Sequence, residues 1–136
     1  MRRRGAIGLA GAVLAFALAQ GVGPAAVADS VIQAGTLYEG KITGLTSGGL
    51  TLDWKLGGKK TFPLSAVQRI SVDGQAELNA AEEAYSQGNA KGAASQYESA
   101  KLKARAGWLQ EFINVRLIDC YGQTQQFARA VRLYVE

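Results

Sequence analysis

The stretch that decides the fold is AEEAYSQGNAKGAASQYESA, which covers residues 81–100 of the 136-residue chain. Gly88 and Asn89 divide it into two segments with helical spacing of small residues. Glycine favours the end of a helix and asparagine is a good N-cap, so this pattern predicts two helices that fold back on each other. Tyr85 and Tyr97 would fill the space between them, and alanines would lie where the helices touch (Ala81, Ala84, Ala93 and Ala100).

The helical pattern extends from residue 76 to the end of the chain. A third helix is expected from about Trp108 to Tyr121, and a fourth from about Gln126. The fourth helix should turn its apolar residues inward: Phe127, Ala130, Val131 and Tyr134. Cys120, the single cysteine, has the spacing of the apolar face of the third helix. We therefore expect a small buried core residue and no reactive thiol.

A β region from about Val31 to Val72 precedes the helices. Residues 50–56 alternate between apolar and polar side chains, which is typical of a half-buried strand. The alternation places Leu50, Leu52, Trp54 and Leu56 on the inner face, and favours burial of Trp54 in the core over stacking on a ligand.

Turn residues divide this region into five short strands within about 42 residues. Gly57-Gly58 supplies the positive φ angles of a tight hairpin. Pro63 lacks an amide donor, so its strand should run at an edge. A flat sheet of this size would leave its apolar face and edges exposed to water, which favours closure into a small barrel.

The β region resembles SH3-like and Sm-like barrels over about 40 residues. The resemblance rests on a bent, glycine-containing strand, a Gly-rich hairpin, and a closing stretch of the form Phe-Pro-Leu-Ser-x-Val-x-x-Ile that begins at Phe62. For a true Sm protein it would imply RNA as the ligand.

The helical region resembles tetratricopeptide repeats. The pattern Ala-Tyr-x-x-Gly-Asn-x-x-x-Ala-x-x-x-Tyr-x-x-Ala runs from Ala84 to Ala100, and a second copy follows at Tyr121, Phe127, Ala130 and Tyr134. Ala93 and Ala130 align with a period of 37 residues, against the usual period of about 34. The expected fold is therefore α+β, with a five-stranded SH3/Sm-like barrel at residues 29–75 and about two tetratricopeptide-like hairpins at residues 76–136. Repeats of this kind need neighbours, so either the barrel covers one end of the array and a partner the other, or the chain is a fragment or a minimal member of a larger exported repeat family, which we favour.

Residues 1–28 have the pattern of a signal peptide. Three arginines precede an apolar run of fourteen residues, Ala6 to Ala19, and Ala26-Val27-Ala28 offers a peptidase site. An uncleaved anchor is the alternative, but fourteen residues span only about 21 Å as a helix, against a hydrocarbon core of about 30 Å. We expect cleavage after Ala28 and an exported protein, periplasmic or secreted. Sec and twin-arginine export both remain open.

The charge balance argues against nucleic acid as a partner. The chain has a formal net charge of +4, but from Asp29 onward twelve Lys and Arg residues face eleven Asp and Glu residues, which leaves +1. Residues 29–75 carry five basic and four acidic residues, and residues 76–136 carry seven of each. Neither half has the one-sided positive field that phosphate binding needs.

The sequence also argues against catalysis. It contains no histidine, which removes the most common general base and the most common zinc ligand. Glu82 and Glu83 are adjacent on a predicted helix and point about 100° apart, so we expect a solvated face and no carboxylate pair. We expect no enzymatic activity, no catalytic or metal-binding residues and no cofactor.

Two functional interpretations follow. The first is an exported, non-catalytic interaction module or scaffold of the bacterial cell envelope, which binds a peptide or protein through its helical surface. The family resemblance then implies that outward residues on the first helix of each pair contact the partner: Glu82, Ser86, Asp119 and Gln123. The alternative is a β-barrel that binds a cell-wall polymer or nucleic acid, with the helices in a structural role.

Overall fold

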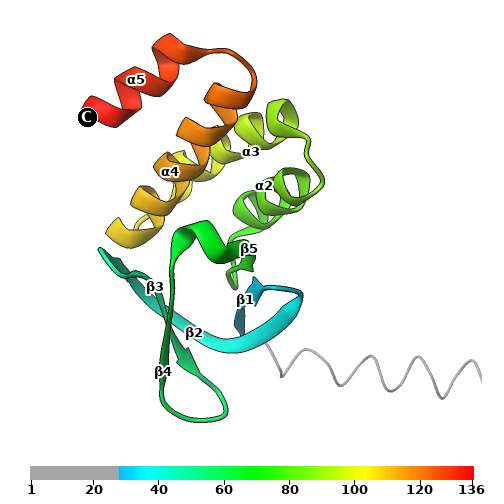
Figure 1. Ribbon diagram of the computed structural model, residues 1–136, viewed down its shortest axis with the longest axis vertical. Coiled ribbons are helices and arrows are strands. Elements are labelled where there is room, and N and C mark those ends of the chain that lie inside the picture. Colours follow the sequence, from blue (N-terminus) through cyan, green and yellow to red (C-terminus); the bar gives the residue numbers. More distant parts are fainter. Residues whose placement is uncertain (1–27) are drawn as a thin grey trace, which may run out of the picture.

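A computed structural model describes residues 28–136 of the chain. Its fold is α+β: a five-stranded antiparallel sheet is followed by four helices on one side of it, of which the first and the third pack against the sheet (Figure 1). The predicted signal peptide, residues 1–28, lies outside the described residues except for Ala28. Within 28–136, no helix has both the length and the apolar character needed to cross a bilayer.

The sheet has the order β4-β3-β2-β1-β5, with every neighbouring pair antiparallel. The strands are β1 Asp29–Gln33, β2 Thr36–Thr46, β3 Gly49–Trp54, β4 Lys59–Phe62 and β5 Val67–Ser71. A single 3-10 turn, η2 Leu64–Ala66, connects β4 to β5 and carries the chain from one edge of the sheet to the other.

The sheet is not closed, so the predicted closed barrel is wrong in this respect. The last strand, β5, pairs with β1 through Val31 and Ile70 and not with β4. Strands β4 and β5 therefore form opposite edges. The edge position predicted for the strand next to Pro63 is confirmed, because β4 has only β3 as a neighbour.

Two glycine positions explain how the strands approach one another. A Cβ on Gly40 would lie 2.1 Å from the backbone oxygen of Asp53 on the neighbouring strand, so only glycine fits there. Gly57 and Gly58 have φ angles of +115° and +79°, as the predicted hairpin requires. Alternation fails just before this hairpin, where Leu56 is 73% exposed and does not face inward as predicted.

The helices are α2 Ala76–Ser86, α3 Ala90–Lys103, α4 Gly107–Gln123 and α5 Phe127–Val135. The predicted turn at Gly88-Asn89 is confirmed, since the Asn89 side chain caps α3 by accepting a hydrogen bond from the Gly92 amide at 3.0 Å. Ala81, Ala93 and Ala100 are all buried, as expected for small residues at a helix contact.

The fourth predicted helix is present, but its predicted burial is wrong. Phe127, Val131 and Tyr134 are 61%, 59% and 81% exposed. They do share one face of α5, as the helical period indicated. No other part of the described chain covers that face, which leaves an apolar stripe on the surface.

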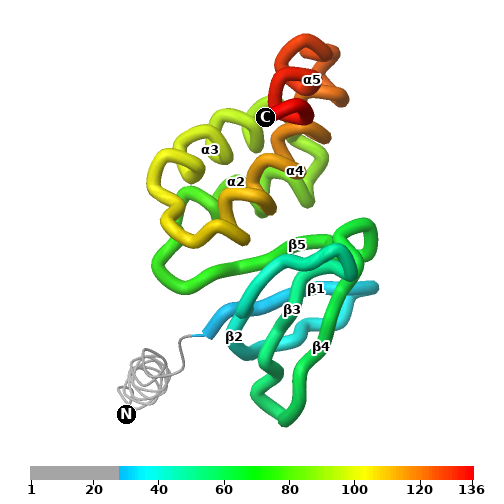
Figure 2. The backbone as a smooth tube through the Cα atoms, turned by 90° about the vertical axis from the view of Figure 1, so that its left-hand side faces the viewer, coloured from blue at the N-terminus to red at the C-terminus, as the bar shows by residue number. Residues whose placement is uncertain are grey.

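The sheet and the helices share one hydrophobic core. Leu50, Leu52 and Ile70 of the sheet belong to the same buried cluster as Leu78, Phe112 and Leu117 of the helices. Strand β5 packs against α2, and β2 packs against α4, on the side of the sheet that faces the helices (Figure 2). The residues that join the helices to the sheet form the candidate functional site.

Candidate functional site

A buried ion pair joins the helices to the sheet. Glu82 of α2 is fully buried and Arg116 of α4 is 7% exposed. The Arg116 Nε donates to Glu82 Oε2 at 2.9 Å, and its Nη2 donates to Oε1 at 3.2 Å. The Ile70 amide of β5 donates to Glu82 Oε1 at 2.7 Å, so one carboxylate connects two helices to an edge strand.

Aromatic side chains enclose this ion pair. Tyr97 of α3 donates its hydroxyl hydrogen bond to Glu82 Oε2. The Arg116 guanidinium lies 4.3 Å from the centre of the Tyr85 ring and 4.9 Å from that of Phe112. A guanidinium between two rings gains cation–π attraction in addition to its pairing with the carboxylate.

Burial among these side chains and the charge of Glu82 shift the pKa values of Arg116 and Tyr97. Burial by itself would lower the pKa of Arg116, but the charge and hydrogen bonds of Glu82 outweigh burial and raise it. Burial, together with the Glu82 charge, raises the pKa of Tyr97 far above its usual range. The guanidinium is therefore charged and the phenol neutral at every pH at which the protein would work. Such a cluster holds elements together and offers no group for proton transfer near neutral pH.

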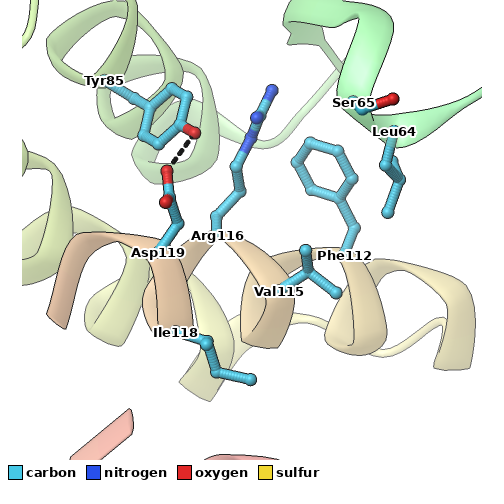
Figure 3. Close-up of a pocket in the computed structure, with 8 residues that line it drawn as sticks. All are labelled: Leu64, Ser65, Tyr85, Phe112, Val115, Arg116, Ile118 and Asp119. Carbon is cyan, nitrogen blue, oxygen red and sulfur yellow. Dashed lines mark hydrogen bonds between the residues drawn. The ribbon is translucent and has the colours of Figure 1, made fainter. Parts of the chain in front are cut away.

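A cleft of about 390 Å³ opens beside the ion pair, between η2, α2 and α4 (Figure 3). Four apolar side chains and four polar ones line it: Leu64, Phe112, Val115 and Ile118, with Ser65, Tyr85, Arg116 and Asp119. The Tyr85 hydroxyl donates a hydrogen bond to Asp119, drawn as a dashed line in Figure 3. Burial, and then this hydrogen bond, raise the pKa of Tyr85.

The structure separates the four residues that were predicted to contact a partner. Ser86, Asp119 and Gln123 are exposed, but Glu82 is not, and the prediction that Glu82 points outward is wrong. Gln123 donates to Asp119 at 2.9 Å, so these two lie together beside the cleft. Ser86 bonds to the Glu83 backbone and does not line the cleft.

Sequence reasoning missed Arg116 and the burial of Glu82, although a signal was present. Glu82 follows Leu78 by four residues and so lies near the apolar face of α2. Arg116 likewise lies on α4 among Phe112, Ile113 and Leu117. Opposite charges on the apolar faces of two neighbouring helices indicate a buried pair, because either charge alone would be too costly to bury.

The remaining groups offer little chemistry. Cys120 is buried as predicted, and burial, followed by the nearby Asp119 charge, raises the pKa of its thiol to about 11. In residues 28–136 no cluster of His, Cys, Asp and Glu side chains has the arrangement of a metal site. What the cleft offers is an apolar wall and an oriented carboxylate, which suit binding.

Comparison of the chain with protein-family models, with curated proteins and with solved structures finds no match.

Proposed function

We propose that this chain is a non-catalytic interaction module of the bacterial cell envelope, which binds a peptide or protein partner through the surface of its helices. The observation that carries the proposal is the cleft between η2, α2 and α4. Its floor is held by the buried Glu82–Arg116 pair, while Val115 at its rim is 45% exposed. Exposed apolar surface beside a rigid, hydrogen-bonded frame is characteristic of interaction sites.

The tetratricopeptide resemblance supports the same proposal. Helices α2 and α3 form one antiparallel hairpin and α4 and α5 form the next, each joined by a short turn. The small residues of the first motif copy, Ala93 and Ala100, are buried where that motif needs close helix contact. We infer that α2–α5 are tetratricopeptide-like, and that the cleft lies on the face where such arrays hold extended segments.

We also infer that the sheet is an open relative of the SH3/Sm-like barrels. Its second strand has an irregularity between Ile42 and Gly44, and a 3-10 turn precedes the last strand. Export is inferred from residues 1–28 alone, whose arginines, apolar run and small-residue site follow the signal-peptide pattern.

The alternative, a ligand-binding sheet, receives less support. A second cleft, of about 410 Å³, lies on the sheet, and its charged residues are of mixed sign: Asp29, Asp53 and Asp73 with Lys41 and Lys55. Such a lining does not favour a polyanion. Trp54, the best stacking residue, is already half-buried, with Lys60 Nζ 4.3 Å from its ring centre.

An affinity capture of the exported protein tests the proposal. The partner should be retained by the wild-type chain, lost with Val115→Lys, and retained with the matched control Leu37→Lys, which changes an exposed apolar residue on the sheet. Loss with Leu37→Lys alone would favour the sheet alternative, and a partner insensitive to Val115 would contradict binding at the cleft.

A further inference from the structure

The exposed charge of α4 is entirely acidic. Glu111, Val115, Asp119 and Gln123 follow one another at intervals of four residues, so they form one stripe along the helix, and all four are exposed. The only basic residue of α4 is Arg116, which is buried against Glu82. Nothing on this helix therefore balances the two exposed carboxylates.

Asp119 is oriented by its neighbours but not neutralised by them. Tyr85 and Gln123 both donate to its Oδ2 atom. Across residues 28–136, no donor reaches Oδ1, and no Lys or Arg nitrogen comes within 4.0 Å of Asp119 or Glu111. Two uncharged donors thus fix the direction of a carboxylate and leave one of its oxygens available.

The apolar wall of the cleft lies next to the Asp119 carboxylate. The Phe112 ring lies between Arg116 and Leu64, with Val115 beside it (Figure 3). The Arg116 charge does not offset that of Asp119, because Glu82 already pairs with it. The cleft therefore combines one net negative charge with an apolar wall.

We propose that the occupant of this cleft is a segment of a partner protein in which a lysine or arginine stands next to an apolar residue. The basic group binds Asp119, and the apolar side chain packs on Leu64, Phe112 and Val115. An acidic segment would be repelled by Asp119 and Glu111, and a purely apolar one would desolvate Asp119 without supplying a counter-charge. This proposal rests on the proposed function and names the chemistry of its partner.

The test uses the purified chain as the target for selection from a display library of random twelve-residue peptides. The enriched sequences should share a Lys or Arg beside an apolar residue. A synthetic peptide of the most enriched sequence is then titrated, by fluorescence anisotropy, into the wild-type chain and into Asp119→Asn. Loss of one charge-assisted contact should weaken binding about tenfold or more. Binding to wild type should also weaken as salt rises.

Two further variants separate a local effect from a general one. Asp53→Asn removes an exposed carboxylate from the sheet and should leave the affinity unchanged. Val115→Ser shortens an exposed side chain of the apolar wall, so it should fold normally and still bind more weakly. Circular dichroism confirms that each variant is folded.

The outcomes distinguish this inference from the proposed function. Enriched peptides that are acidic, or that bind Asp119→Asn as tightly as wild type, would overturn the basic-segment inference and leave a helical binding surface standing. If no sequence is enriched, while a control protein with a known peptide ligand yields its motif, the basic-segment inference fails, and the proposed function is decided by the affinity capture with Val115→Lys and Leu37→Lys.

Discussion

The buried pair Glu82–Arg116 provides the sharpest prediction about stability. Arg116→Met alone would leave the Glu82 carboxylate fully buried without a counter-charge. Glu82→Gln alone would do the same to the guanidinium. Removing one partner of a buried pair costs about 3–5 kcal/mol, a large share of the roughly 5–15 kcal/mol by which a domain is stable.

The double variant Glu82→Gln with Arg116→Met should recover most of that loss. The Gln oxygen can still accept from the Ile70 amide and its amide group can donate to the Tyr97 hydroxyl, so few polar groups are orphaned. We expect a net cost of about 0–2 kcal/mol for the pair, far below the sum of the single changes.

Urea unfolding, followed by circular dichroism and by the fluorescence of Trp54 and Trp108, measures these free energies. Glu83→Gln is the matched control, because its pairing with Arg69 is long, at 3.8 Å, and exposed. It should cost less than about 1 kcal/mol. If the two single variants lose free energies that simply add in the double variant, or lose as little as Glu83→Gln, then Glu82 and Arg116 do not stabilise the fold as a buried pair.

Three other predictions follow from single contacts. Gly40→Ala should cost more than about 1 kcal/mol of stability, because the new Cβ would lie 2.1 Å from the Asp53 backbone oxygen. Gly44→Ala is the control, since a Cβ there meets nothing within 4 Å. Thermal melts in which Gly44→Ala is the less stable variant would be inconsistent with the strand packing. Asn89→Ala should cost about 1 kcal/mol and Asn89→Ser much less, because serine still caps α3; equal urea midpoints for the two would argue against the cap. Burial, and then the Glu98 hydrogen bond, raise the pKa of Tyr121 from 10.0 to about 12. The unfolded chain therefore releases this proton at a lower pH than the folded chain, so the free energy of unfolding should fall as the pH rises from 10 towards 12. Tyr121→Phe should flatten this decline in urea midpoints, and an unchanged slope would contradict the assignment.

Local features of the fold were predictable from the sequence because local residues determine them. The hairpin glycines, the Asn89 cap and the buried alanines each depend on a few neighbouring residues, and all three are confirmed. Closure of the sheet was not predictable, since alternation shows which residues share a face and says nothing of how two distant edges meet.

The two wrong predictions in the helices, the burial of the α5 stripe and the exposure of Glu82, have the same cause, because a sequence pattern does not show what a face packs against. The stripe Phe127, Val131 and Tyr134 was correctly placed on one face, but a stripe does not reveal what covers it. The sequence predicts a solvated face for Glu82, because Glu82 and Glu83 point about 100° apart on the helix and form no carboxylate pair. Its burial depends on Arg116, 34 residues away, and was visible only by comparing the apolar faces of two helices.

Photo-crosslinking in bacteria that express the full chain tests most directly whether the cleft binds a partner. A photoreactive amino acid replaces Val115 at the cleft or Leu37 on the sheet, both of which are exposed. We expect one discrete adduct from position 115, lost when Asp119→Asn is added, and none from position 37. An adduct from position 37 alone, or none from either position while the full-length chain accumulates in the cells, would contradict binding at the cleft.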